Sequence, residues 1–177
     1  MFVKQNSDKN FCLWYTEKRK VVKNLKALIF SDSHRSFNPM MNAIKNEGKI
    51  DLIIHAGDVL ADVEDLKIMY PQCPIAYVKG NNDWWDREAV EDRFFEFDKV
   101  KIFLTHGHNY GVKYSLAKLL KKGEEVGADI CIFGHTHSVF NEKIGNLTLF
   151  NPGSASRHYG LLQTDGNGGF ELNIVDV

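Results

Sequence analysis

The stretch Ile130-Cys131-Ile132-Phe133-Gly134-His135-Thr136-His137 decides the fold. It begins with a short apolar run that predicts a buried strand, and this run ends at a glycine. Two histidines follow at positions i and i+2, so an extended backbone would point His135 and His137 to opposite sides of the chain. One ion held between them is then disfavoured. Two neighbouring ions, each bound by one imidazole, are the alternative to a plain polar turn.

Three earlier apolar runs have the same character, and each also ends in polar residues. Residues 25–30, 51–56 and 74–78 predict strands, and the intervening segments 39–48 and 63–69 carry helix patterns. Strand and helix alternate at a spacing that is typical of parallel βαβ units with right-handed crossovers.

The second half of the chain follows a different pattern. Residues 94–97 and 100–105 predict a hairpin, and residues 114–126 predict a helix that stops at Gly127. Short antiparallel strands are expected at 140–144, 147–150, 160–163 and 170–175. Both halves fit an α/β (α+β) fold in which two mixed sheets pack together and helices cover the outside.

The composition indicates a globular protein with a sizeable core. The chain has 177 residues, of which 44% are hydrophobic and 25% charged. We expect one domain over residues 25–177. Residues 1–24 mix an aromatic patch with a basic run, and we expect an N-terminal arm or added strand that packs on the domain or on another subunit; a disordered leader is the alternative.

Charge and cysteine usage exclude several classes of protein. The net charge of −1 and the pI near 6.6 provide no basic track for a nucleic acid. Cys12, Cys73 and Cys131 are odd in number and form no CxxC pair, which argues against a disulfide framework and favours a cytoplasmic location. No apolar run is long enough to span a membrane, and the N-terminus does not resemble a secretory signal.

Polar residues follow almost every predicted strand. They are Asp32, His34, Asp58, Asn81, Asp83, His106, His108, His135 and His137. The carboxyl ends of strands in α/β sheets gather in one crevice, so these separate segments are expected to converge. The remaining histidines, His55 and His158, also fall beside strand ends, and we expect His55 to be a core residue.

This set of side chains predicts a metal centre. Carboxylates, an amide and imidazoles together suit Mn, Fe or Zn. They are too many for one ion, whereas two ions bridged by a carboxylate would use them all. Two divalent cations against two aspartates would leave about +2 in the crevice, which favours an anionic substrate. A pair of ions is the usual means of in-line attack on phosphorus, and no serine or cysteine nucleophile is then needed.

Five motifs follow one another along the chain: Asp32-x-His34, Gly57-Asp58, Gly80-Asn81, His106-Gly107-His108 and Gly134-His135-x-His137. This series resembles that of the calcineurin-like metallophosphoesterases, and most closely that of their small single-domain bacterial and archaeal phosphodiesterases. The run from Thr105 to Lys113 and Asn151-Pro152-Gly153-Ser154 strengthen the resemblance, which covers residues 26–170.

The resemblance implies a four-layer αββα sandwich with a dimetal centre at the sheet ends. It implies two divalent ions, for which we expect Mn²⁺, with Fe, Zn or Ni as alternatives. A hydroxide bridging the ions would attack the phosphodiester. By motif, one ion would be held by Asp32, His34 and His137, and the other by Asn81, His106 and His135, with Asp58 as the bridge.

The identity of the general acid stays open. Many relatives have a histidine after the Gly-Asn pair, where this chain has Asn82. Asp83 is a candidate acid, although a helix-capping role is at least as compatible with its position. Asn81 and His108 are candidates for both catalysis and substrate binding. The Arg157 guanidinium is a candidate for gripping a phosphate oxygen.

Trp84 and Trp85 could form a wall for a base or an aromatic leaving group, but we expect core packing ahead of that role.

Three functions remain to be compared. The first is hydrolysis of a small phosphodiester, with no membrane and no nucleic-acid partner, by a protein that forms a homo-oligomer or acts alone. The second is a scaffold that kept this fold and lost its activity. The third is a phosphomonoesterase or nuclease with the same chemistry. Every motif ligand is present in the sequence, which favours an enzyme over a scaffold.

Overall fold

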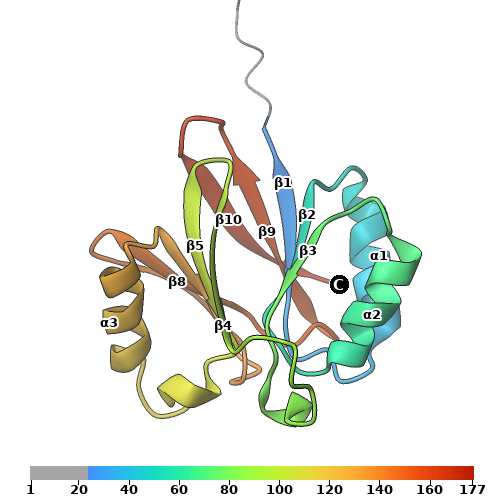
Figure 1. Cartoon of the computed structure of the whole chain (residues 1–177). Helices are drawn as coiled ribbons and strands as arrows, with labels where there is room; N and C mark the ends of the chain where they lie inside the picture. Colours follow the sequence, from blue (N-terminus) through green and yellow to red (C-terminus); the bar gives the residue numbers. More distant parts are fainter. Residues whose placement is uncertain (1–23) are drawn as a thin grey trace, which may run out of the picture.

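The computed structural model describes residues 24–177, which form two five-stranded mixed sheets that face each other (Figure 1). Sheet A has the order β10-β9-β1-β2-β3, and sheet B has the order β4-β5-β6-β8-β7. The strands of sheet A are β1 (Lys26–Phe30), β2 (Leu52–His55), β3 (Ile75–Tyr77), β9 (His158–Thr164) and β10 (Phe170–Asp176). Those of sheet B are β4 (Asp92–Phe97), β5 (Val100–Thr105), β6 (Ile130–Ile132), β7 (Val139–Ile144) and β8 (Leu147–Pro152).

Helices cover the outer faces of both sheets and complete the four layers. α1 (Phe37–Glu47) and α2 (Leu60–Met69) lie against sheet A, and α3 (Ala117–Val126) lies against sheet B (Figure 1). Two short 3₁₀ helices, η1 (Asn81–Asp83) and η2 (His108–Tyr110), follow β3 and β5. The predicted αββα sandwich is therefore confirmed.

The apolar runs that form β1, β2 and β6 are inner strands buried on both faces, whereas the run that forms β3 lies at the edge of sheet A and is partly exposed. In β1, Ala27 and Ile29 belong to the core between the two sheets, whereas Leu28 and Phe30 pack under α1. Strands covered on both sides need apolar residues at every position, which explains why β1 shows no alternation of polar and apolar residues. The centre of each sheet is parallel, since β1 pairs with β2 and β5 with β6 in that sense.

One connection between the sheets was not predicted. After β8 the chain leaves sheet B, and β9 pairs antiparallel with β1, so that Ile29 lies opposite Gly160. The predicted hairpin is confirmed, with β4 and β5 antiparallel.

Two further expectations have different outcomes. Core packing of Trp84 and Trp85 is wrong, because their exposed fractions are 82% and 57%. The predicted arm lies outside the described residues except for Asn24, so this prediction and the domain division are not tested. Within residues 24–177, no helix has the length and hydropathy needed to cross a membrane.

Candidate metal centre

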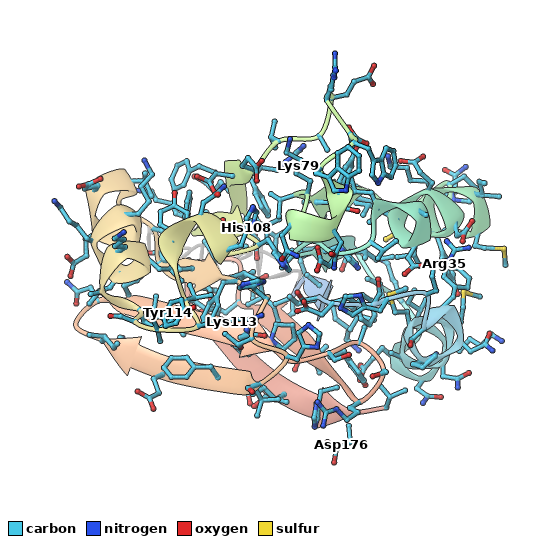
Figure 2. The ribbon with its side chains drawn as sticks, turned by 90° about the horizontal axis from the view of Figure 1, so that it is seen from below. Arg35, Lys79, His108, Lys113, Tyr114 and Asp176 are labelled. Atoms are coloured by element: carbon cyan, nitrogen blue, oxygen red, sulfur yellow. The ribbon has the colours of Figure 1, made fainter. Side chains whose placement is uncertain are left out.

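Loops at the carboxyl ends of β1, β2, β3, β5 and β6 meet at one end of the sandwich, which Figure 2 views from below. They carry all seven side chains that were predicted as ligands. Five of these residues have a positive φ: Asp32 (51°), His34 (42°), Asp58 (50°), His135 (67°) and His137 (57°). Non-glycine residues rarely adopt this region of backbone space, and such strain concentrates at functional sites.

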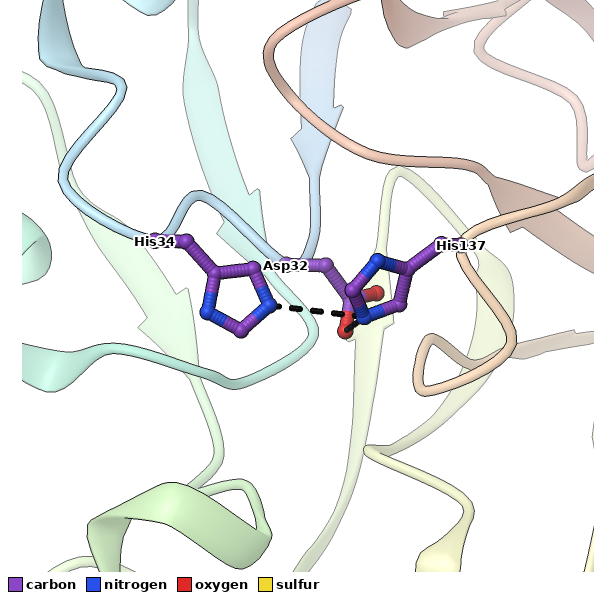
Figure 3. A group of neighbouring side chains, drawn as sticks. All are labelled: Asp32, His34 and His137. Carbon is purple, nitrogen blue, oxygen red and sulfur yellow. Dashed lines mark hydrogen bonds and ion pairs between the residues drawn. The ribbon is translucent and has the colours of Figure 1, made fainter.

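The first group of possible ligands is Asp32, His34 and His137 (Figure 3). The Nε2 atoms of His34 and His137 lie 3.4 Å apart, and His137 Nε2 lies 3.2 Å from Asp32 Oδ1. These three atoms therefore converge on a common point, as ligands of one ion would.

The two oxygens of the Asp32 carboxylate have different environments. Its Oδ2 accepts hydrogen bonds from the Ser31 hydroxyl at 2.8 Å and from the backbone N–H of His135 at 3.0 Å. Its Oδ1 is buried and has no hydrogen-bond partner within the described structure. Burial raises the pKa of Asp32, against the opposing effect of His106. A buried acceptor without a partner is costly, and a cation at this point would satisfy it.

The second group is Asp32, Asp58 and His106. His106 Nε2 lies 3.6 Å from Asp58 Oδ2 and 4.0 Å from Asp32 Oδ1. The other ring nitrogen, Nδ1, lies 2.8 Å from the carbonyl oxygen of Ala56. Since a carbonyl only accepts, Nδ1 carries the proton and the lone pair of Nε2 faces the site, which is the arrangement expected of a metal-binding histidine.

Asn81 and His135 border this second group. The Asn81 Oδ1 atom lies 3.2 Å from His106 Nε2, and the His135 ring centroid lies 5.1 Å from that of His106. Burial, reinforced by His106 and Lys113, lowers the pKa of His135 to about 4. This imidazole is therefore neutral at physiological pH, which is the state that binds a cation.

The bridging role assigned to Asp58 remains a prediction. Among residues 24–177, Asp32 belongs to both ligand groups, and Asp58 belongs to the second only. Both oxygens of Asp58 accept hydrogen bonds from Asn82, from its backbone N–H at 3.0 Å and its side-chain amide at 2.8 Å. Asn82, which stands where many relatives have a histidine, thus orients the Asp58 carboxylate.

Two glycines of the motifs let the loops approach closely. A Cβ atom on Gly80 would lie 1.9 Å from Asp58 Oδ1 and 2.6 Å from the Asp58 backbone nitrogen. A Cβ atom on Gly134 would lie 1.9 Å from Ser31 Oγ and 2.9 Å from Asp32 Oδ2. Any other residue at these positions would push the ligand loops apart.

The candidate acid Asp83 is hydrogen-bonded to the backbone of the ligand loops. Its buried carboxylate accepts the backbone N–H groups of Asp58 at 3.2 Å, Leu60 at 2.9 Å and Gly80 at 2.9 Å. A carboxylate that accepts three backbone N–H groups holds the loops in place, which favours the capping interpretation.

Two of the three candidates for substrate contact, His108 and Arg157, lie at the edge of the centre. His108 Nε2 lies 3.5 Å from Glu91 Oε2, and burial lowers the pKa of His108. The Arg157 guanidinium donates to the carbonyl oxygen of His137 at 3.4 Å.

A buried network behind the ligands was not predicted. Asp62 Oδ2, on α2, accepts the Ser33 hydroxyl at 2.6 Å and the backbone N–H of Arg35 at 2.9 Å. His55 Nε2 lies 3.2 Å from Ser33 Oγ, and His55 Nδ1 accepts the N–H of Gly57. The pKa of His55 falls to about 4 through burial, as expected for the predicted core histidine. Sequence spacing carries no signal for Asp62, which lies in a helix.

The arrangement fits two divalent cations. It offers carboxylate oxygens, imidazole nitrogens and an amide oxygen, and one carboxylate oxygen, Asp32 Oδ1, is a buried acceptor without a hydrogen-bond partner among residues 24–177. Mixed oxygen and nitrogen ligands of this kind suit Mn, Fe or Zn.

The comparisons with known proteins identify the family. Residues 25–167 match the model of the calcineurin-like phosphoesterase superfamily domain, and the chain belongs to this superfamily. It is 35% identical over 132 residues to the probable metallophosphoesterase YsnB of Bacillus subtilis, covering 73% of this chain and 75% of the relative. It is 31% identical over 149 residues to the phosphodiesterase MJ0936 of Methanocaldococcus jannaschii, covering 73% and 83%.

Solved structures share the fold. A predicted phosphoesterase from Streptococcus pneumoniae superposes with a TM-score of 0.72 at 26% identity, covering 87% of this chain and 90% of the other. Vps29 from Entamoeba histolytica, in complex with Zn²⁺, gives a TM-score of 0.68 at 22% identity, covering 86% and 99%. At this identity, the likeness to Vps29 concerns the fold alone.

Proposed function

We propose that this protein hydrolyses small phosphodiesters with the help of two divalent metal ions. The observation that carries the proposal is Asp32 Oδ1, a buried acceptor that has no hydrogen-bond partner among residues 24–177, faces His137 and is shared by both ligand groups. When bound, the ions would supply the positive charge that activates a water molecule and polarises the phosphoryl oxygens.

The residues of the chain would bind and orient the reactants. Asp32, His34 and His137 would hold one ion, and Asp58, Asn81, His106 and His135 the other, with Mn²⁺ as the expected metal. His108 and Arg157 would contact phosphate oxygens from the rim. No side chain is assigned as general acid, so we expect esters with good leaving groups to react fastest.

A scaffold function on the same fold, without catalytic activity, is the competing proposal. In this chain all seven ligand side chains are present, and five of them, Asp32, His34, Asp58, His106 and His137, are brought together within two groups. The neutral state of His135, and the proton on His106 Nδ1, also prepare the imidazoles for cations. These features favour an enzymatic function over a scaffold function.

The test is hydrolysis of bis(p-nitrophenyl) phosphate by protein loaded with Mn²⁺. Asp58→Asn should reduce kcat/KM by at least about 100-fold, because the loss of one ligand charge weakens the binding of metal. Glu142→Gln, on the exposed face of β7, is the matched control and should keep wild-type turnover. A fully active Asp58→Asn protein would refute the role of Asp58, and an inactive wild type with both ions bound would refute the enzyme.

A further inference from the structure

Two neighbouring tryptophan side chains, in the loop that follows Asn81 of the metal centre, are exposed to solvent. Trp84 is 82% exposed and Trp85 is 57% exposed, and Val90 in the same loop is 43% exposed. A tryptophan is among the largest apolar side chains, and an exposed pair of them calls for a binding function.

The backbone places these indoles relative to the predicted ligands. η1 is extended by one turn, because the N–H of Asp83 donates to the Gly80 carbonyl at 3.1 Å and that of Asp86 to the Asp83 carbonyl at 3.0 Å. Trp84 itself has φ −58° and ψ −23°, which are 3₁₀ values. Side chains at i and i+3 eclipse each other in such a helix, about 6 Å apart along its axis.

This register puts each tryptophan one turn beyond an asparagine of the site. Trp84 follows Asn81, whose Oδ1 lies 3.2 Å from His106 Nε2. Trp85 follows Asn82, whose side-chain amide donates to Asp58 Oδ2 at 2.8 Å. Each indole thus follows, by three residues, an asparagine whose side chain reaches the centre, and the loop that carries the indoles borders the site.

Hydrogen bonds within the loop that carries the indoles fix its conformation. Asp86 Oδ1 accepts the backbone N–H groups of Glu88 at 2.8 Å and Ala89 at 2.9 Å. The N–H of Lys79 donates to the carbonyl of Val90 at 3.0 Å, which closes the loop at its base. The exposed conformation is therefore built in advance, which lowers the entropic cost of binding.

We propose that Trp84 and Trp85 form a subsite for a planar aromatic group of the phosphodiester, a nucleobase or an aryl ring; this inference rests on the proposed function. The loop from Lys79 to Glu91 carries four carboxylates (Asp83, Asp86, Glu88 and Glu91) against two cations (Lys79 and Arg87), so its charge disfavours a second phosphate and the subsite fits an uncharged ring better than a polynucleotide backbone. Stacking of a ring on the indoles would orient the phosphodiester toward Asn81.

The test compares ligands that differ only in the ring. Binding of AMP and ribose 5-phosphate to the Mn²⁺-loaded protein is measured by calorimetry, and phenyl phosphate against methyl phosphate separates an aryl ring from a nucleobase. We expect the compound with the ring to bind about 5- to 150-fold more tightly in at least one pair. In the Trp84→Ala/Trp85→Ala variant this ratio should approach one, and Trp84→Phe/Trp85→Phe should restore part of it.

The matched control is Ile68→Ala on α2, which removes a side chain of similar exposure (75%) and should keep the wild-type ratio. The proposed subsite is refuted if the wild type binds the compounds with and without the ring equally well in both pairs. It is also refuted if the double alanine variant keeps the wild-type preference for the ring. A wild-type dimer that dissociates in the alanine variant, without any preference for a ring, would assign the indoles to a protein interface instead. Hydrolysis of bis(p-nitrophenyl) phosphate tests the proposed function separately.

Discussion

At the scale of single residues, the centre depends on side chains that are held in costly states. Asp32 is buried, its backbone is left-handed, and only one of its two oxygens has protein partners. A cation bound at Asp32 Oδ1 would offset these costs. The burial of Asp32 is therefore explained by the cation that it would bind. The burial of Asp62 is explained by the loop from Ser33 to Arg35, which it holds in place.

Replacement of Asp62 by asparagine should weaken metal binding without touching a ligand. The variant loses the charged acceptor of the Ser33 hydroxyl and of the Arg35 N–H, which flank His34 on both sides. Loss of a partner behind metal ligands typically costs 10- to 100-fold in affinity, so we expect a roughly 10- to 100-fold rise in the Kd for Mn²⁺, measured by calorimetry.

Asp65→Asn is the matched control for that experiment. Asp65 lies on the same helix and contacts the same guanidinium, with Oδ2 3.5 Å from Arg35 Nη1, but its side chain is 45% exposed. It should leave the Kd unchanged. An Asp62→Asn protein with wild-type affinity at both sites would show that the network only stabilises the fold.

At this scale the sequence could predict which side chains converge at the centre but not the residues that support them. His34, His106 and the other ligands stand in short motifs directly after apolar runs, so their positions carry a signal. Asp62 reaches Ser33 across 29 residues of chain, from the first turn of a helix. Only the packing of α2 against the β1 loop creates that contact, and no local pattern reports it.

At the scale of elements, each of these strands supports one loop of the centre. The strands themselves are fixed by side-chain hydrogen bonds such as those of Glu47. This residue ends α1; its Oε2 accepts from Lys26 of β1 at 2.9 Å, and its Oε1 accepts from the Tyr159 hydroxyl of β9 at 2.9 Å. It therefore ties one helix to two neighbouring strands.

Glu47→Gln should lower the stability of the protein in a pH-dependent way. The hydrogen bond from Lys26 lowers the pKa of Glu47 below its usual 4.5. A carboxylate with a lowered pKa stabilises the fold above the unfolded pKa, and this stabilisation is lost as the pH falls through the folded pKa. We expect a deficit of about 1 kcal/mol at pH 7 that shrinks below about pH 4.5, measured by urea unfolding.

Glu64→Gln provides the comparison, because Glu64 pairs with Lys67 on the exposed face of α2, where its side chain is 62% exposed. It should change stability little at any pH. A Glu47→Gln deficit that persists undiminished at pH 3.5 would exclude the ionised carboxylate as its cause.

Element prediction from the sequence succeeded where a signal was local. The apolar runs, the helix stop at Gly127 and the β4–β5 hairpin all correspond to observed elements. The placement of β9 beside β1 could not be predicted, since it joins residues more than 130 positions apart. The exposure of Trp84 was missed because apolar character alone predicts burial.

At the scale of the whole molecule, the metal centre joins the two sheets. Asp32, Asp58 and Asn81 follow strands of sheet A, whereas His106 and His135 follow strands of sheet B. Each proposed ion would thus hold ligands from both halves of the sandwich. Binding to the folded state alone stabilises it, so occupancy of the centre should be visible in global unfolding.

Saturating Mn²⁺ should raise the Tm of the metal-free protein. At 100 times the Kd the stabilisation is about 2.7 kcal/mol, which for a chain of this size corresponds to roughly 5–10 °C. Asp32→Asn should abolish most of this shift in calorimetric scans, because Asp32 belongs to both ligand groups. The metal-free variant should nevertheless be at least as stable as the wild type, since burial of the ionised carboxylate, which raises the pKa of Asp32, is relieved. A wild-type Tm that does not change on addition of Mn²⁺ would contradict a metal centre that joins the two sheets. An Asp32→Asn protein that keeps the full Mn²⁺-induced rise in Tm would contradict it as well.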